Sequence, residues 1–406
     1  MLVVGVLLHL FTGAVSATEE KKRKPGYIPL GPFDLIPMLD IQQGYDDNIF
    51  RNDLNKKSSW VTLTRPGFQL ALEQALNRYA LSYGFQSSIF WDSHRDDFVD
   101  HFLRGDAHVE VNRRNRFDLN GQLSYSHYQR GTFFSQGNLI NLIKEPDQFH
   151  SYELGGKYTF GAEEAKGNVV LDVQYFDLQF DNHLERTRVR NRQDLVLSPA
   201  FHVRLFPKTA VLTQFEYTRT DYPDATAPPF NISGDKMRYL VGASWQQTAK
   251  TTGVVKIGYL QMEFDDPRNQ SFSDVTWGVD LKWRPLTYSS ITLQTVKNVF
   301  PTQGFGNSAA SQIVSLSWEH EWSYHFATQM DFAHSDIDNK GSNRKDERLS
   351  AGFELRYRMR PWLNFGLSYD YSDLKSNQSI FDFQRNVVMF SVFTNPLAKS
   401  YLRGIY

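Results

Sequence analysis

One stretch of the sequence changes side-chain character at every residue, and this alternation constrains the fold more than any other feature. From Glu347 to Asp373, apolar residues alternate with polar or charged ones, and the pattern breaks only at Met359-Arg-Pro-Trp362. Successive side chains of a β-strand point to opposite faces, so the stretch predicts two strands joined by a tight turn. Pro361 suits that turn because proline has no N–H to give to a sheet. The strands are much longer than the about 5–6 residues usual in soluble sheets.

The same alternation runs from Leu35 almost to the end of the chain, and connections of two kinds interrupt it. Short turns are expected at Leu76 to Arg78, Asn112 to Asn115, Gly161 to Ala165, Pro207-Lys208, Ala249-Lys250, Pro285 to Thr287, Ser323-Tyr324 and Arg360-Pro361. Longer connections, rich in Asp, Asn, Gly, Pro and Ser, are expected at Arg51 to Ser58, Asp92 to Asp97, Gly131 to Asp147, Asn182 to Arg188, Asp221 to Gly234, Asp265 to Ser271, Phe300 to Ala310, Asp336 to Lys345 and Asp373 to Ser379.

The strict alternation of short and long connections is typical of an outer-membrane barrel, with short turns in the periplasm and longer loops outside the cell. Eight turns and nine loops require about 18 strands. We therefore predict an all-β fold, a transmembrane antiparallel up-and-down β-barrel over residues 35–394. A strand of about 14 residues tilted by about 40° rises roughly 35 Å, which is enough to cross an apolar band about 25 Å tall.

The alternation also predicts which side chains face lipid. Tyr and Trp near strand ends suit the headgroup level, where an amphipathic ring is favoured. The outward set is expected to include Val169, Leu171, Val173, Tyr175, Val211, Thr213, Phe215, Tyr217, Val275, Trp277, Val279, Leu281 and Trp283. The interface set is expected to include Trp283, Tyr288, Trp318, Trp322, Tyr324 and Trp362.

The two ends of the chain differ from the patterned region. Leu2 to Phe11 is apolar and is followed by the small-residue end Val15-Ser-Ala17, which predicts a signal peptide over residues 1–17. No basic residue precedes the apolar run, so an uncleaved anchor is the alternative, although the run is shorter than the about 20 residues a spanning helix needs. Residues 18–34 form a charged, then Pro- and Gly-containing periplasmic leader, and residues 395–406 a C-terminal tail after Asn395-Pro396 breaks the alternation.

Composition excludes several classes of function. Lys plus Arg total 44 against 45 for Asp plus Glu, so no nucleic-acid partner is expected. Cysteine is absent, which removes disulfides and thiolate chemistry. A membrane barrel reconciles long strands with the mean hydropathy of −0.47, because lumen and lipid faces average within each strand.

The polar faces of the strands supply candidate functional residues of both charge signs. Charged side chains at this depth would be costly in lipid, so they must line water or pair with one another. One reading is a lumen of mutually compensating charges without a specific ligand, and the other is a polar track for a hydrophilic solute or chain. The candidate lumen-lining residues are Asp106, His108, Glu110, Asp172, Glu216, Asp280, Lys282, Arg284, Glu319, Glu321, Glu354, Arg356 and Arg358.

No sequence motif points to catalysis or to a cofactor. Asp106, His108 and Glu110 share one strand face and have a spacing that permits metal binding or acid–base chemistry, but any polar lumen face supplies the same spacing. A nucleotide-binding glycine loop, a zinc signature and a serine-hydrolase elbow are all missing from the sequence. We therefore expect neither a catalytic residue, a cofactor nor a metal.

The opening hairpin of the patterned region resembles a known family. Gln43-Gly-Tyr-Asp-Asp-Asn-Ile-Phe50 and Ser59 to Leu70, which contains Pro66-Gly67, are similar to the first hairpin of the "Putative beta-barrel porin 2" family, in which EpsL-type proteins accompany exopolysaccharide biosynthesis. Elsewhere the likeness is in the strand plan, to about Phe393. The tail departs from the usual ending on an aromatic last strand, which leaves Phe393 and Tyr406 as alternative assembly signals.

The resemblance implies a conduit in the Gram-negative outer membrane for export of an exopolysaccharide or capsular polysaccharide. Its implied partners are outer-membrane lipid, the secreted polysaccharide and export components of the periplasm and inner membrane. The residues themselves imply only a barrel with a polar lumen. A general or solute-specific diffusion porin is the first alternative, and an outer-membrane enzyme is the second.

Overall fold

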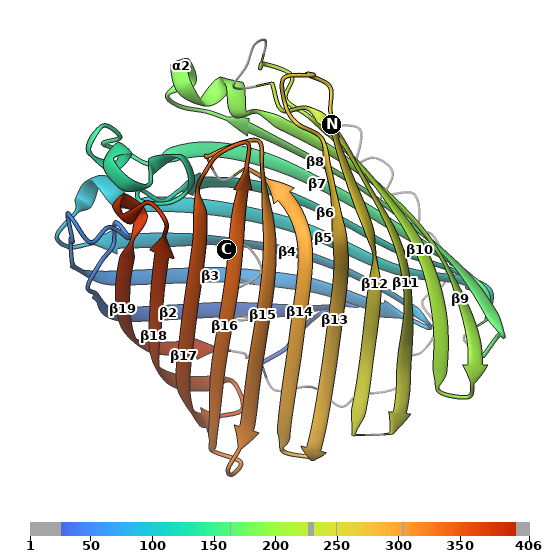
Figure 1. The fold of residues 1–406 in the computed structure, drawn as a ribbon. Helices are drawn as coiled ribbons and strands as arrows, with labels where there is room; N and C mark the ends of the chain where they lie inside the picture. The colour runs from blue at the N-terminus through green and yellow to red at the C-terminus, as the bar shows by residue number, and fades with distance from the viewer. Residues whose placement is uncertain (1–25, 163, 226–230, 249, 303, 395–406) are drawn as a thin grey trace.

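The structure is a computed structural model that describes residues 26–162, 164–225, 231–248, 250–302 and 304–394. The predicted signal peptide and C-terminal tail lie outside these residues, as do residues 18–25 of the leader. Figure 1 shows a single sheet of long strands that curves round until its first and last members meet. None of the helices described is long and apolar enough to cross a membrane.

Eighteen strands form the wall, and each continues the alternation read from the sequence. Their bounds are β2 (Phe33–Asp46), β3 (Ser59–Gln74), β4 (Asn77–Phe90), β5 (Phe98–Asn112), β6 (Asn115–Tyr128), β7 (Asp147–Phe160), β8 (Gly167–Phe180), β9 (Arg192–Phe206), β10 (Thr209–Asp221), β11 (Gly234–Thr248), β12 (Thr251–Phe264), β13 (Phe272–Leu286), β14 (Ser289–Pro301), β15 (Ser308–Glu321), β16 (Phe326–Lys340), β17 (Lys345–Arg360), β18 (Leu363–Ser376) and β19 (Phe383–Thr394).

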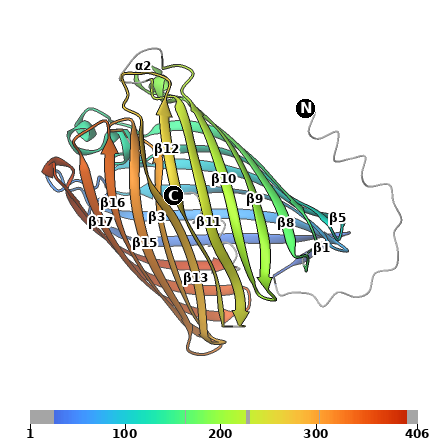
Figure 2. The ribbon, with the colours of Figure 1, turned by 45° about the vertical axis from the view of Figure 1, so that its right-hand side comes forward.

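Every strand pairs antiparallel with its neighbours in sequence order. The wall closes where β19 pairs with β2, from Val387 opposite Asp46 to Phe393 opposite Asp40. The predicted fold class is therefore confirmed: a closed antiparallel barrel of 18 strands. A short extra strand, β1 (Ile28–Leu30), forms a hairpin with the start of β2. It lies at the end of the barrel away from α2 (Leu184–Thr187), as the turned view in Figure 2 shows.

All eight predicted short turns join strands at one end of the barrel, and the nine longer connections lie at the other. Two of the longer connections are shorter than the sequence suggests. The predicted loop Asp336 to Lys345 is in fact residues 341–344, because Asp338 pairs opposite Lys345 and extends the ladder. The longer connections carry α2 and the 3-10 helices η2 (His94–Asp96), η3 (Phe133–Ser135), η4 (Gly137–Asn141), η5 (Arg188–Arg190) and η6 (Ser379–Phe381).

The outward face of the wall is apolar, as the alternation predicts. Val169, Leu171 and Val173 leave 46%, 37% and 37% of their surfaces exposed. A broad apolar surface of this kind is unfavourable in water and suits the acyl chains of a membrane. Large aromatic residues are exposed at the end with the short turns, which fits the interface level. They are Trp283, Tyr288, Trp322, Tyr324 and Trp362.

Candidate solute pathway

Side-chain contacts that skip a strand identify the lumen face. Arg356 on β17 lies 3.5 Å from Glu319 on β15, with β16 between them, and Lys256 on β12 donates to Gln214 on β10 at 2.8 Å. Neighbouring strands are about 4.8 Å apart, so such pairs meet most readily on the concave side, where side chains converge. Glu354, with 4% of its surface exposed, lies 3.6 Å from Arg356 on this same face.

Most of the predicted lumen residues have polar partners on the wall. Asp106 pairs with Arg104 at 2.8 Å, and His108 lies between Asp118 at 2.6 Å and Glu110 at 3.6 Å. Asp172 accepts a hydrogen bond from Gln174 at 3.2 Å.

Further round the wall, Glu216 pairs with Arg238 at 3.1 Å, and Asp280 accepts from Gln294 at 2.9 Å. Glu321 lies 3.8 Å from Arg358, whose guanidinium also lies 5.4 Å from the Tyr324 ring centroid.

These pairs arrange charges of both signs along the wall. Lys282 and Arg284 lie near the short-turn end of β13. The Lys282 side chain is half-buried and the Arg284 side chain is exposed. The described residues contain no group of three or more His, Asp or Glu side chains able to hold a metal ion. The arrangement can bind and orient hydrophilic molecules by hydrogen bonds and charge.

The connection between β6 and β7, residues 129–146, lies across the barrel mouth, and we call it the constriction loop. Its first contact is with the β2–β3 connection, where Asn52 donates to the carbonyl of Gly137 at 3.1 Å and Arg51 donates to Gln129 at 2.9 Å. On the β4–β5 connection, Arg130 forms a two-pronged ion pair with Asp96, both contacts at 2.6 Å. A paired arginine fork of this kind fixes orientation as well as position.

The constriction loop also reaches the far wall. Arg344, between β16 and β17, donates to the side chain of Gln136 at 2.7 Å. The β6–β7 and β16–β17 connections stand nearly opposite each other in an 18-strand ring, so this contact bridges the mouth. Gly137 has a φ of +59°, and an added Cβ would lie 2.8 Å from the ring of Phe381, between β18 and β19. Glycine is therefore required where the loop packs on that connection.

Arginine side chains pack on aromatic rings around the constriction loop. The guanidinium of Arg190 lies 3.6 Å from the ring centroid of Phe134, and that of Arg344 lies 3.8 Å from that of Phe381. Such contacts combine apolar packing with attraction between a cation and a ring face. The first contact holds the loop to the β8–β9 connection, and the second joins the β16–β17 and β18–β19 connections, both of which the loop contacts.

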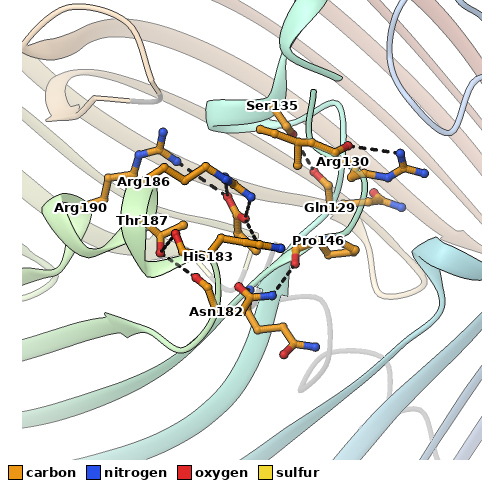
Figure 3. Close-up of polar contacts among 12 residues, drawn as sticks. Gln129, Arg130, Ser135, Pro146, Asn182, His183, Arg186, Thr187 and Arg190 are labelled. Atoms are coloured by element: carbon orange, nitrogen blue, oxygen red, sulfur yellow. Dashed lines mark hydrogen bonds and ion pairs between the residues drawn. The ribbon is translucent and has the colours of Figure 1, made fainter. Parts of the chain in front are cut away.

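A carboxylate at the start of β7 holds the next connection in place. Asp147 pairs with Arg186 and lies 3.0 Å from His183, and these two side chains converge from one short segment (Figure 3). Arg190 lies 3.8 Å from the same carboxylate. Burial lowers the pKa of Arg190 to about 10, although Asp147 opposes this shift, so the guanidinium stays charged at neutral pH. The end of the constriction loop is thereby fixed to the β8–β9 connection.

Positive charge gathers beneath the constriction loop. Burial lowers the pKa of Arg51 well below its usual value, and the nearby guanidinium groups of Arg385 and Arg348 lower it further, whereas Asp46 opposes them. Arg385 is paired with Asp46 at 2.6 Å. In the described part of the chain, Arg348 has no carboxylate within ion-pair distance. This arginine cluster therefore carries an excess of positive charge beside the constriction loop.

Sequence reasoning missed the arginine cluster, and it left open whether the loop Gly131 to Asp147 folds into the lumen. Arg348 continues the polar face of its strand, Ser350 to Arg358, so the alternation was a sufficient signal for it. Arg51 and Arg344 lie in connections, where alternation gives no direction. Only their contacts across the mouth reveal their position.

Comparison with known proteins gives one family assignment. The model of the family described as "Putative beta-barrel porin 2" matches residues 25–395, which is nearly the whole chain. No curated protein matches the sequence.

Several solved outer-membrane structures are similar in outline. Pseudomonas aeruginosa OccK2 (OpdF), in complex with glucuronate, has a TM-score of 0.48 at 10% identity over 89% of this chain and 98% of that one. P. aeruginosa OccK5 (OpdH) has a TM-score of 0.46 at 12% identity, with 89% and 98% covered. A BenF-like porin from Pseudomonas fluorescens Pf-5 has a TM-score of 0.47 at 9% identity, with 89% and 99% covered.

The family match and the closed, lipid-facing barrel agree with each other. Together they place the chain in the Gram-negative outer membrane and describe a channel rather than an enzyme. This chain belongs to the "Putative beta-barrel porin 2" family, as an outer-membrane barrel of 18 strands with a polar lumen.

Proposed function

We propose that the protein is a passive channel for small hydrophilic solutes, and that the constriction loop sets its size limit. The observation that carries this proposal is that the loop, which starts from β6 and β7, reaches the nearly opposite β16–β17 connection, where Arg344 donates to Gln136. A segment tied at both sides of a mouth narrows the opening permanently. Small solutes pass such an opening by diffusion, whereas a thick polymer does not.

Export of a polysaccharide is the finer function that the family resemblance suggests. It would require the constriction loop to leave the mouth, and several buried contacts hold it there, including the pair of Arg130 with Asp96. Buried pairs are costly to break one partner at a time, because the remaining charge is left without compensation. The geometry therefore favours diffusion of small solutes over passage of a polymer.

Uptake by liposomes containing the purified protein tests the proposal. We expect swelling in solutions of small sugars and amino acids, with a rate that falls sharply for oligosaccharides of increasing length. A variant in which a Gly-Ser linker replaces residues 132–142 should admit longer oligosaccharides. Its unheated sample should still migrate differently from a boiled one on a gel, which shows that the barrel is folded. Absence of small-solute uptake, together with loss of surface polysaccharide in a deletion strain, would instead establish export.

A further inference from the structure

The wall has a seam that is closed only along part of its length. β13 and β14 are paired from Leu286 opposite Ser289 to Trp277 opposite Lys297, and the pairing stops there. β14 nevertheless continues to Pro301, paired with β15 alone. The described residues of the β14–β15 hairpin tip, 298–302 and 304–311, therefore lie apart from β13.

The tip bends into the lumen. Lys236 on β11 donates from Nζ to the backbone carbonyl of Val299 on β14 at 3.2 Å, although two strands separate β11 from β14. Three interstrand steps of about 4.8 Å make roughly 14 Å along the wall, which a lysine side chain does not span. Val299 also packs with Leu260 and Met262 of β12 in a buried apolar cluster. The hairpin tip is therefore held on the lumen side of β11 and β12.

Two backbone N–H groups beside the unpaired part of the β13–β14 seam have side-chain acceptors. If the register continued, Val275 would lie opposite Val299. Each of these residues donates its N–H to the side chain just before it instead, Val275 to Asp274 at 2.7 Å and Val299 to Asn298 at 2.8 Å. A backbone N–H that the ladder leaves unpaired needs another acceptor, and these side chains provide one at the exposed Val275 and at the buried Val299. The inward position of the tip is thus a stable arrangement of the chain.

A cavity lies between the inward hairpin tip and strands β8–β11. The cavity has a volume of about 490 Å³ and lies between the lumen faces of β8–β11 and the residues Phe300 and Ser308 of the hairpin. Sites for small molecules commonly fall between about 300 and 1,000 Å³, with apolar surface on one side and a few placed polar groups. Phe300 and Met262 supply the apolar side here.

The charges of the cavity balance, which indicates the class of ligand. Asp194 is paired with Arg192 at 3.0 Å, and Glu216 with Arg238 at 3.1 Å. Neither an anion nor a cation gains a net attraction from a neutral set of charges. The carboxylates are Asp172, Asp194 and Glu216, and the cations at or beside the cavity are Arg192, Lys236 and Arg238.

Two buried polar groups at this cavity have no partner within the described residues. They are Nε of Arg238, a residue with 9% of its surface exposed, and Oγ of Ser308, with 2% exposed. Buried donors without partners are rare and call for an explanation, because each costs about 1–3 kcal/mol. A bound molecule with oxygen acceptors would satisfy both.

We propose that this cavity binds a small, neutral, polyhydroxylated solute such as a sugar or sugar alcohol. Hydroxyl groups both accept and donate, so they suit the unpaired donors of Arg238 and Ser308 as well as the carboxylates of Asp172 and Glu216. Phe300 provides an apolar surface for the C–H face of a ring. The inference rests on the proposed channel function and adds a binding site at which the solute pauses on its way through the lumen.

Single-channel recording in planar lipid bilayers, with sorbitol as the neutral probe and gluconate as its acidic counterpart, tests this assignment. We expect sorbitol to interrupt the ion current of the wild-type channel and gluconate to interrupt it less. Ser308→Ala should weaken the interruptions by about tenfold in apparent affinity, as expected for one lost hydrogen bond to a buried group. The double variant Glu216→Gln with Arg238→Gln removes a donor without leaving a lone charge and should also weaken them.

Ser317→Ala is the matched control, since Ser317 lies on the same strand, β15, outside the cavity. It should leave the interruptions unchanged, and heat-modifiable migration on a gel checks that each variant folds. An open channel with no response to sorbitol would overturn the binding site while leaving the channel function intact. Interruptions that persist in both cavity variants, or that are stronger with gluconate, would also overturn it. Absence of any ion current would instead refute the channel function.

Discussion

Arg344 donates a hydrogen bond to the side-chain oxygen of Gln136 at 2.7 Å, across 208 positions of sequence. One residue belongs to the β16–β17 connection and the other to the constriction loop, so this bond ties the loop to the far wall. The barrel mouth is therefore bridged by side-chain contacts and not by the strand ladder. On the loop side the contact depends on Gln136, whereas Arg344 also pairs with the buried Asp346 at the start of β17.

Gln136→Ala should raise the frequency of high-conductance openings in planar bilayers, and it leaves the buried pair of Arg344 with Asp346 intact. A hydrogen bond contributes about 0.5–1.5 kcal/mol, so its loss should increase the population of the displaced loop by about 2- to 12-fold. Gln378→Ala is the matched control, because Gln378 is an exposed glutamine in the β18–β19 connection. Equal behaviour of the two variants would show that the Gln136 contact does not hold the loop.

The arginine cluster beneath the loop should favour anions. Arg348→Gln removes a positive charge that has no carboxylate partner among the described residues, so the reversal potential in a salt gradient should move toward cation preference. Arg360→Gln removes the same charge from the other end of the same strand, β17, and should shift the potential much less. The effect of Arg348 should shrink as ionic strength rises, because the Debye length falls from about 10 Å at 0.1 M to 3 Å at 1 M. An equal shift from both variants would contradict a selective role for the cluster.

Acid should release the β12–β13 connection from β10. The ion pair of Arg219 with Asp265, 2.6 Å apart, lowers the pKa of the Asp265 carboxyl below its usual value. A carboxyl with a lowered pKa in the folded state stabilises above its unfolded pKa, and this contribution is lost as pH falls through the folded value. The protection factors of the amides in residues 265–271, which compare each exchange rate with that of an unfolded chain at the same pH, should therefore fall at low pH in the wild type. Asp265→Asn should show low protection factors at neutral pH already and little further change in acid, and a wild-type-like profile would exclude this ion pair as the cause.

The strands of the wall could be predicted from the sequence because the side on which each residue lies depends only on its neighbours in sequence. The face of each side chain follows from its position in the strand. The alternation predicts an inward Glu354 and Arg356 and an outward Val169, and in the structure Glu354 lies 3.6 Å from Arg356 while Val169 leaves 46% of its surface exposed. The turn at Pro361 was predicted equally well, from the break in the alternation at Met359 to Trp362.

The contents of the lumen could not be predicted in the same way. The bond between Asn52 and Gly137 joins residues far apart in sequence, and nothing in either segment specifies the other. The inward bend of the β14–β15 tip was equally hidden, because Asn298 and Phe300 keep a regular alternation while their hairpin leaves the wall. Long-range contacts, not local periodicity, decide what fills the barrel.

The orientation of the barrel can be tested at the two ends of one strand. β3 begins after the connection that contains Leu54 and ends at the turn that contains Leu76, and these residues have 68% and 64% of their surfaces exposed. A protease site inserted next to an exposed loop residue is cut readily wherever the protease has access. In intact cells we expect cleavage after insertion beside Leu54 and none beside Leu76, because short turns face the periplasm in barrels of this kind. Both insertions should be cut once the outer membrane is permeabilised, which controls for accessibility. Cleavage of the Leu76 insertion alone in intact cells would place the constriction loop on the periplasmic side and reverse the direction assigned to the pathway.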